Sequence, residues 1–149
     1  EEGTLFIVEI GFAPNQENFS SNQYASDFQK AVEIAQTYNG ALIIIEGHSD
    51  PLAILKAEKK GESQAVINQM KQKAKNLSYR RGQAVRDSFL KYCAQKNLVV
   101  DESQFVAIGL GATMPKYNPP RTEAEWNANR RVVFRIKQME AELSGFEPL

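Results

Sequence analysis

The chain has very little of the residue types that most often carry catalysis or covalent cross-links. Its 149 residues include one cysteine, Cys93, and one histidine, His48. A single cysteine excludes an internal disulfide, and a single histidine would leave a zinc site dependent on carboxylate ligands, which is unusual. The sequence has no Ser-His-Asp order, Walker phosphate loop or CxxC pair. We therefore expect a protein that is not an enzyme and that binds no metal or cofactor.

Long apolar runs and an excess of charge of one sign are also missing. The longest apolar run, residues 41–45, has the length of a strand, far below the roughly 20 residues that cross a bilayer. Basic and acidic residues balance at 18 each, and aromatic residues do not alternate with basic ones as stacking platforms for nucleic acid require. We expect no transmembrane segment in this chain and no nucleic-acid partner.

The beginning of the chain contains no recognisable targeting signal. It opens on Glu1, with neither a methionine nor a secretory signal. We therefore expect a mature product or an excised domain, and the compartment cannot be inferred from a leader.

The hydrophobic periodicity alternates between strands and helices. Strands are expected at 5–11, 41–45, 105–108 and 131–137. Helices are expected at 22–38 and 79–96, with a short helix near Glu123. Ser20 or Ser21 is expected to cap the first long helix and Ser78 the second. The run 41–45 is apolar at every position, which is typical of a strand covered on both faces. The pattern predicts one α/β domain built on a βαβ unit, with a frayed tail at 138–149.

The segment 51–76 is less regular than its surroundings and breaks near Gly61. We expect one or two helices there. The apolar residues at helical spacing are predicted to face the domain: Val66, Ile67, Met70 and Ala74. The lysines are predicted to lie in solvent: Lys59, Lys60, Lys71 and Lys73.

Cys93 and His48 each allow two interpretations. Cys93 falls on the apolar face of the helix at 79–96, so a buried core residue is favoured over a reactive thiol. His48 follows a strand end, where α/β sheets usually bind ligands. A side chain that bonds to the backbone at the strand end is favoured over a direct ligand contact.

Asp50 and Arg81 form a more informative pair. Asp50 follows a strand, and Arg81 is the third residue after the expected N-cap Ser78. A cation is electrostatically unfavourable in the first turn of a helix, where anions are preferred. One interpretation is that the site awaits a zwitterion, whose carboxylate lies on Arg81 and the helix N–H groups while Asp50 takes the ammonium. The other is a plain salt bridge between the two side chains, and the residues alone do not choose between them.

Four short motifs occur in order along the chain. Residues 47–50 read Gly-His-Ser-Asp, and residues 77–85 read Leu-Ser-Tyr-Arg-Arg-Gly-Gln-Ala-Val. Gly-Leu-Gly at 109–111 is followed by Pro115, and residues 129–132 read Asn-Arg-Arg-Val. In this order and on these elements, they resemble the signature of the OmpA-like, or peptidoglycan-associating, domain that also occurs in Pal lipoproteins and flagellar stator proteins.

This resemblance implies both a fold and a function. The fold is a βαβαβ-type sandwich in which helices pack on a mixed four-stranded sheet, with a core at 5–137 and a helical insertion at about 51–76. The function is non-covalent binding of peptidoglycan through the diaminopimelate of its stem peptide, in the periplasm and in association with the outer membrane. By its motifs the resemblance implies the ligand-binding residues Ser49, Asp50, Arg81 and Arg130.

The sequence also departs from the family pattern. Residues 51–76 make the interval before Leu77 longer than usual, Ala74 stands where an asparagine is usual, and Gly82 replaces an alanine. Trp126 stands where an arginine is frequent. The longer interval and the lost asparagine favour an alternative function, in which an OmpA-like fold contacts other envelope proteins through the insertion.

Overall fold

The computed structural model describes residues 4–12, 24–38 and 40–137. The expected caps Ser20 and Ser21 and the tail 138–149 lie outside the described residues. The strands are β1 (Thr4–Gly11), β2 (Leu42–Gly47), β3 (Phe105–Gly109) and β4 (Arg131–Lys137). The helices are α1 (Ala25–Thr37), α2 (Leu52–Lys59), α3 (Gln64–Gln95), the 3-10 helix η2 (Glu102–Gln104) and α4 (Glu123–Asn129). All four predicted strands and the short helix near Glu123 are confirmed.

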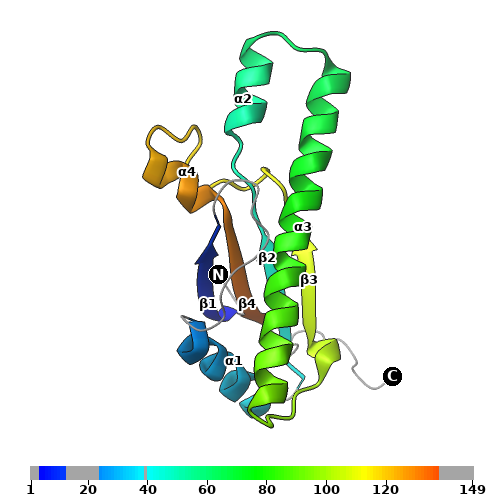
Figure 1. The fold of residues 1–149 in the computed structure, drawn as a ribbon, viewed down its shortest axis with the longest axis vertical. Helices are drawn as coiled ribbons and strands as arrows, with labels where there is room; N and C mark the ends of the chain where they lie inside the picture. The colour runs from blue at the N-terminus through cyan, green and yellow to red at the C-terminus, as the bar shows by residue number, and fades with distance from the viewer. Residues whose placement is uncertain (1–3, 13–23, 39, 138–149) are drawn as a thin grey trace, which may run out of the picture.

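The strands form one mixed sheet in the order β1-β4-β2-β3. β4 runs antiparallel to both β1 and β2, while β2 and β3 are parallel. Figure 1 shows α1 and α3 lying across the same face of this sheet. The predicted class, helices on a mixed four-stranded sheet, is therefore confirmed.

The core lies between this face and the two helices. Burial alternates along β2, where Ile43 and Ile45 are buried and Leu42 and Ile44 are half-buried. The expectation that 41–45 is fully covered on both faces was therefore wrong, because both long helices pack on one side. Four phenylalanines make ring contacts across the core: Phe28, Phe89, Phe105 and Phe134.

Cys93 lies in this core at 1% exposure. Burial raises the pKa of its thiol to about 11, so the nucleophilic thiolate is scarce at neutral pH. The interpretation of Cys93 as a packing residue is confirmed.

Helix α3 differs most from the prediction. It begins at Gln64 rather than near Tyr79, and Ser63 caps it by accepting a hydrogen bond from the Val66 amide at 3.3 Å. The helix continues without a break because no proline or glycine interrupts the sequence between Gln64 and Arg81. Ser78 is therefore not an N-cap but an interior residue of a 32-residue helix. Its hydroxyl donates to the Lys75 carbonyl at 2.8 Å.

The predicted insertion is a helical hairpin. It consists of α2 and the first half of α3, joined by a turn in which Gly61 has φ +80°. Figure 1 shows the hairpin projecting beyond the end of the sheet. Inside it, Ile54, Ala57 and Ile67 form a small apolar cluster, against which Met70, Ala74 and Ala112 pack.

Two parts of the prediction for this segment had different outcomes. Ile67 is buried and Met70 and Ala74 are half-buried, but Val66 is 38% exposed. The inward placement of Val66 was therefore wrong, because the face of α3 that meets α2 is narrower than the apolar run. The four lysines predicted to lie in solvent are all exposed: Lys59, Lys60, Lys71 and Lys73.

Three glycines bring α3 close to the ends of β2 and β3. A Cβ atom on Gly47 would lie 1.7 Å from the Ser78 carbonyl oxygen, and one on Gly109 would lie 2.6 Å from the Lys75 carbonyl oxygen. Gly82, which stands where the family usually has an alanine, faces the Ile45 carbonyl, and a Cβ atom on it would lie 3.1 Å from that oxygen. This close approach places the middle of α3 beside the loop that follows β2.

None of the helices in the described part of the chain combines the length and the apolar character needed to cross a bilayer.

Candidate functional site

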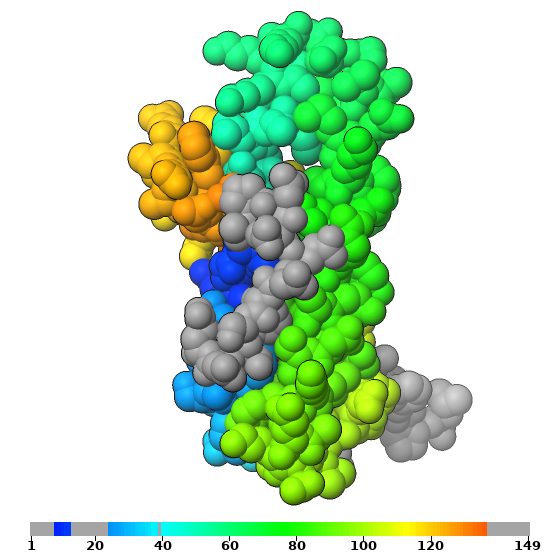
Figure 2. Space-filling model, in the orientation of Figure 1, coloured from blue at the N-terminus to red at the C-terminus, as the bar shows by residue number. Residues whose placement is uncertain are grey.

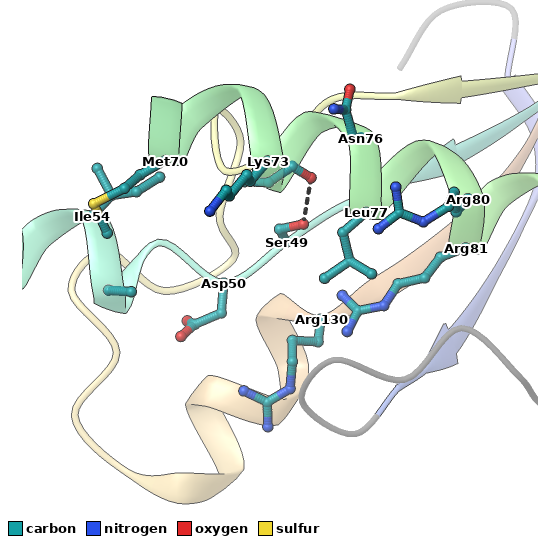
Figure 3. Close-up of a pocket in the computed structure, with 12 residues that line it drawn as sticks. Ser49, Asp50, Ile54, Met70, Lys73, Asn76, Leu77, Arg80, Arg81 and Arg130 are labelled. Carbon is teal, nitrogen blue, oxygen red and sulfur yellow. Dashed lines mark hydrogen bonds between the residues drawn. The ribbon is translucent and has the colours of Figure 1, made fainter. Parts of the chain in front are cut away.

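A cavity of about 680 Å³ opens where the loop after β2 meets α2, α3 and the start of β4. All four residues predicted to bind ligand line it, and Figure 3 shows them around one space. The described lining residues are Ser49, Asp50, Ala53, Ile54, Met70, Lys73, Ala74, Asn76, Leu77, Arg80, Arg81 and Arg130. Residues 80 positions apart in sequence are thus brought to one site.

The Asp50 carboxylate is held in place from two sides. One oxygen accepts a hydrogen bond from the Asn129 side-chain amide at 3.0 Å, and the other accepts one from the Leu52 backbone amide at 3.3 Å. Asn129 is itself fixed, because its side chain exchanges two 2.9 Å hydrogen bonds with the backbone of Tyr117. The carboxylate is therefore pre-organised, while the side chain remains half-buried at the cavity edge.

Arg81 reaches the cavity from the middle of α3. Its side chain is fully buried, and its guanidinium carbon lies 5.3 Å from the centroid of the Phe12 ring, within the range of a cation–π contact. Figure 3 shows it extending from the helix toward the side of the cavity that holds Asp50.

The proposed electrostatic role of the helix N-terminus was wrong. Because α3 begins at Gln64, the amides around Arg81 lie inside a continuous helix rather than at a free end. Recognition of a carboxylate here would depend on the guanidinium itself.

Asp50 and Arg81 do not neutralise each other directly. The ion pairs between described side chains do not include one that joins them. Asp50 instead bonds to the neutral groups of Asn129 and Leu52. The plain salt bridge, one of the two interpretations of this pair, is therefore not found between these two described side chains.

Ser49 and Arg130 are largely engaged with the protein. The Ser49 hydroxyl donates to the Ala74 carbonyl at 2.9 Å, which ties the loop after β2 to the hairpin. Arg130 donates through Nε to the Phe12 carbonyl at 3.2 Å and through a terminal nitrogen to the Asn127 side chain. Both line the cavity, but their bonds indicate that they shape it.

His48 lies outside this cavity. Its backbone amide bonds to the Arg131 carbonyl at 2.8 Å, and its side chain is 2% exposed. The expected side-chain hydrogen bond to the strand-end backbone is not found among the described residues, and Nε2 lies 3.4 Å from a Glu46 carboxylate oxygen. Burial, with a smaller contribution from Arg131, lowers the pKa of His48.

The charged groups of the site are mostly cationic. Within the described ranges, no group of three or more histidine, cysteine, aspartate or glutamate side chains could hold a metal ion. Of the described lining residues, four are cationic and one is acidic: Lys73, Arg80, Arg81, Arg130 and Asp50. The lining therefore carries both signs of charge, with an excess of positive charge.

No family model and no curated protein matches the sequence, but solved structures match the fold. The peptidoglycan-associated lipoprotein from Burkholderia pseudomallei is 19% identical with a TM-score of 0.62, over 87% of this chain and 89% of that chain. The periplasmic domain of Helicobacter pylori MotB is 16% identical with a TM-score of 0.62, over 93% and 86%. The OmpA-like domain of FopA1 from Francisella tularensis is 16% identical with a TM-score of 0.55, over 89% and 71%. The chain has the OmpA-like fold.

On this OmpA-like fold, the sequence interpretation missed one residue of the site. Asn129 is fully buried and orients Asp50, and neither role was assigned to it. Its signal was present, since it opens the Asn-Arg-Arg-Val motif. The 79-residue separation from Asp50 hid the contact.

Proposed function

We propose that this chain is a non-catalytic module that binds peptidoglycan and links an envelope protein to the cell wall. The ligand is the diaminopimelate of the stem peptide, whose free end is a zwitterion. Asp50 takes its ammonium and Arg81 its carboxylate. The observation that carries the proposal is that a carboxylate and a guanidinium, those of Asp50 and Arg81, line one cavity.

The comparisons support this proposal at the level of the fold. One structural neighbour is named as associated with peptidoglycan, and another as a periplasmic domain. By analogy the module belongs in the periplasm, with a parent protein associated with the outer membrane. Other envelope proteins form a second class of partner.

The contacts predict a weak single site. Each hydrogen bond to a charged group contributes about 1.5–3 kcal/mol net, while association itself costs several kcal/mol. A dissociation constant of roughly 10 μM to 1 mM is expected for a stem peptide. Firm attachment would then come from many domains on one polymeric wall, which raises the effective concentration.

The test is a pull-down on purified sacculi with charge-removing variants of similar size. Asp50→Asn and Arg81→Met should each abolish binding, and thermal unfolding should show that both variants are folded. Asp87→Asn and Arg121→Gln change exposed residues outside the cavity and should bind like the wild type.

If both cavity variants are folded and bind sacculi as the wild type does, the proposal is wrong. The hairpin as a protein-binding surface would then be the better explanation.

A further inference from the structure

The hairpin builds one wall of the cavity. Ala53 and Ile54 of α2 and Met70, Lys73 and Ala74 of α3 line it opposite the residues proposed to hold the zwitterion. The volume of about 680 Å³ lies within the roughly 300–1,000 Å³ typical of sites that enclose whole small ligands. A single zwitterionic carbon centre fills only part of such a space. The remainder can hold the peptide attached to it.

This wall is apolar and supported from behind. Ile54 is 7% exposed and packs in the cluster with Ala57 and Ile67, while Met70 packs against the same cluster. Their positions are therefore set by contacts inside the hairpin. An aliphatic part of a ligand would lose water against this wall without a rearrangement of the protein.

Lys73 adds a positive charge to the same wall. Figure 3 shows it between Met70 and Ser49, extending from α3 toward the cavity. A zwitterion at Asp50 and Arg81 is neutral overall and brings no net negative charge to Lys73. A further carboxylate on the ligand would balance the charge of this lysine.

Figure 2 shows how the hairpin forms one end of the molecule, with α4 beside its base. A second cavity of about 590 Å³ lies between the hairpin and the loop that contains Leu110 and Thr113. Lys71, only two residues from Lys73, lines this second cavity and not the first. Lys71 can therefore serve as a control for Lys73, because both lie on α3 but line different cavities.

We propose that the hairpin forms a second subsite for the acidic residue linked to diaminopimelate in the stem peptide. Lys73 binds the free α-carboxylate of that residue, and Ile54 and Met70 cover the aliphatic chain beside it. This inference rests on the proposed function, since it requires the zwitterion at Asp50 and Arg81. It assigns the hairpin to ligand recognition rather than to obstruction of the site or to a protein partner.

The test compares three probes by calorimetry or by titration of amide shifts. The probes are free meso-diaminopimelate, the tripeptide L-Ala-γ-D-Glu-meso-diaminopimelate, and the same tripeptide with the glutamate α-carboxylate amidated. One exposed charge contact corresponds to about a fivefold change in affinity. The wild type should bind the tripeptide at least about fivefold more tightly than either other probe, and added salt should reduce the difference.

Two variants assign the difference to a side chain. Lys73→Gln should remove the preference for the tripeptide, and it should still bind free diaminopimelate. Lys71→Gln should keep the full preference. Both lysines are exposed, so neither variant is expected to unfold.

The results separate this inference from the proposed function. Equal binding of all three probes by the wild type, or an unchanged preference in Lys73→Gln, overturns the second subsite while peptidoglycan binding stands. Absence of binding for every probe overturns both.

Discussion

Replacement of Asn129 by aspartate tests the geometry of the site with a change of one atom. In the wild type the Asn129 amide nitrogen donates to the Asp50 carboxylate at 3.0 Å and to the Tyr117 carbonyl at 2.9 Å. In Asn129→Asp, a carboxylate oxygen would face a carboxylate and a carbonyl across the same distances. Two hydrogen bonds become two repulsive contacts at a position with 0% exposure.

The size of the effect follows from those two contacts. Removal of a partner from a buried polar group costs about 1–3 kcal/mol, and like charges within hydrogen-bond distance add to this. We expect Asn129→Asp to lower the free energy of unfolding by about 2–4 kcal/mol at pH 7.5.

The loss should depend on pH in one direction. Burial and the neighbouring carboxylate raise the pKa of the introduced carboxyl in the folded state. The penalty therefore develops above the pKa of about 3.9 in the unfolded chain and is complete only above the raised folded value. At pH 5 the protonated carboxyl can donate to Asp50, so part of the stability should return.

Urea unfolding at pH 5 and pH 7.5 measures this difference. Asn127→Asp is the matched control, because it makes the same chemical change on α4 at an exposed residue whose side-chain oxygen already accepts from Arg130. Asn127→Asp should leave the free energy of unfolding unchanged or raise it slightly. Equal stability of Asn129→Asp and the wild type at both pH values would refute the positioning of Asp50 by Asn129.

The other predictions concern the frame around the site. Gly47→Ala should lower the free energy of unfolding by about 3 kcal/mol or more, because its Cβ would lie 1.7 Å from the Ser78 carbonyl oxygen. Gly11→Ala is the control, because a Cβ there has nothing within 4 Å. In urea unfolding it should change the free energy of unfolding by less than about 1 kcal/mol. Burial lowers the pKa of His48 in the folded protein. Below about pH 6.5 the unfolded chain therefore binds a proton at this residue more readily than the folded protein does, and the free energy of unfolding falls as the pH falls. His48→Gln should reduce that loss between pH 7 and pH 5, and an unchanged pH slope would exclude this role. Replacement of residues 52–73 by a short glycine linker should keep a cooperative thermal transition, since the hairpin packs its own cluster; its disappearance would show that the hairpin is part of the core.

The sequence by itself determined the strands and identified charged residues that line the cavity. Short runs rich in apolar and β-branched residues placed all four strands. The motif that ends in Asp50 and the motif that contains Arg81 identified two charged side chains that the fold brings to one cavity. The departure from the family interval also marked residues 51–76 as an addition, which the structure shows as a hairpin.

Only the tertiary structure decided where α3 begins and which residues support the site. Ser78 is a good N-cap by composition, yet the helix continues through it. Its hydroxyl donates to the Lys75 carbonyl at 2.8 Å and accepts from the Gly111 amide at 2.9 Å. The role of Asn129 depends on a contact across 79 residues, and that of Gly82 on the approach of a strand carbonyl. A local sequence pattern reflects the periodicity of a single helix or strand. The contacts of Ser78, Gly82 and Asn129 instead join two elements that are far apart in the sequence. The sequence around one residue therefore does not show which residue it will contact.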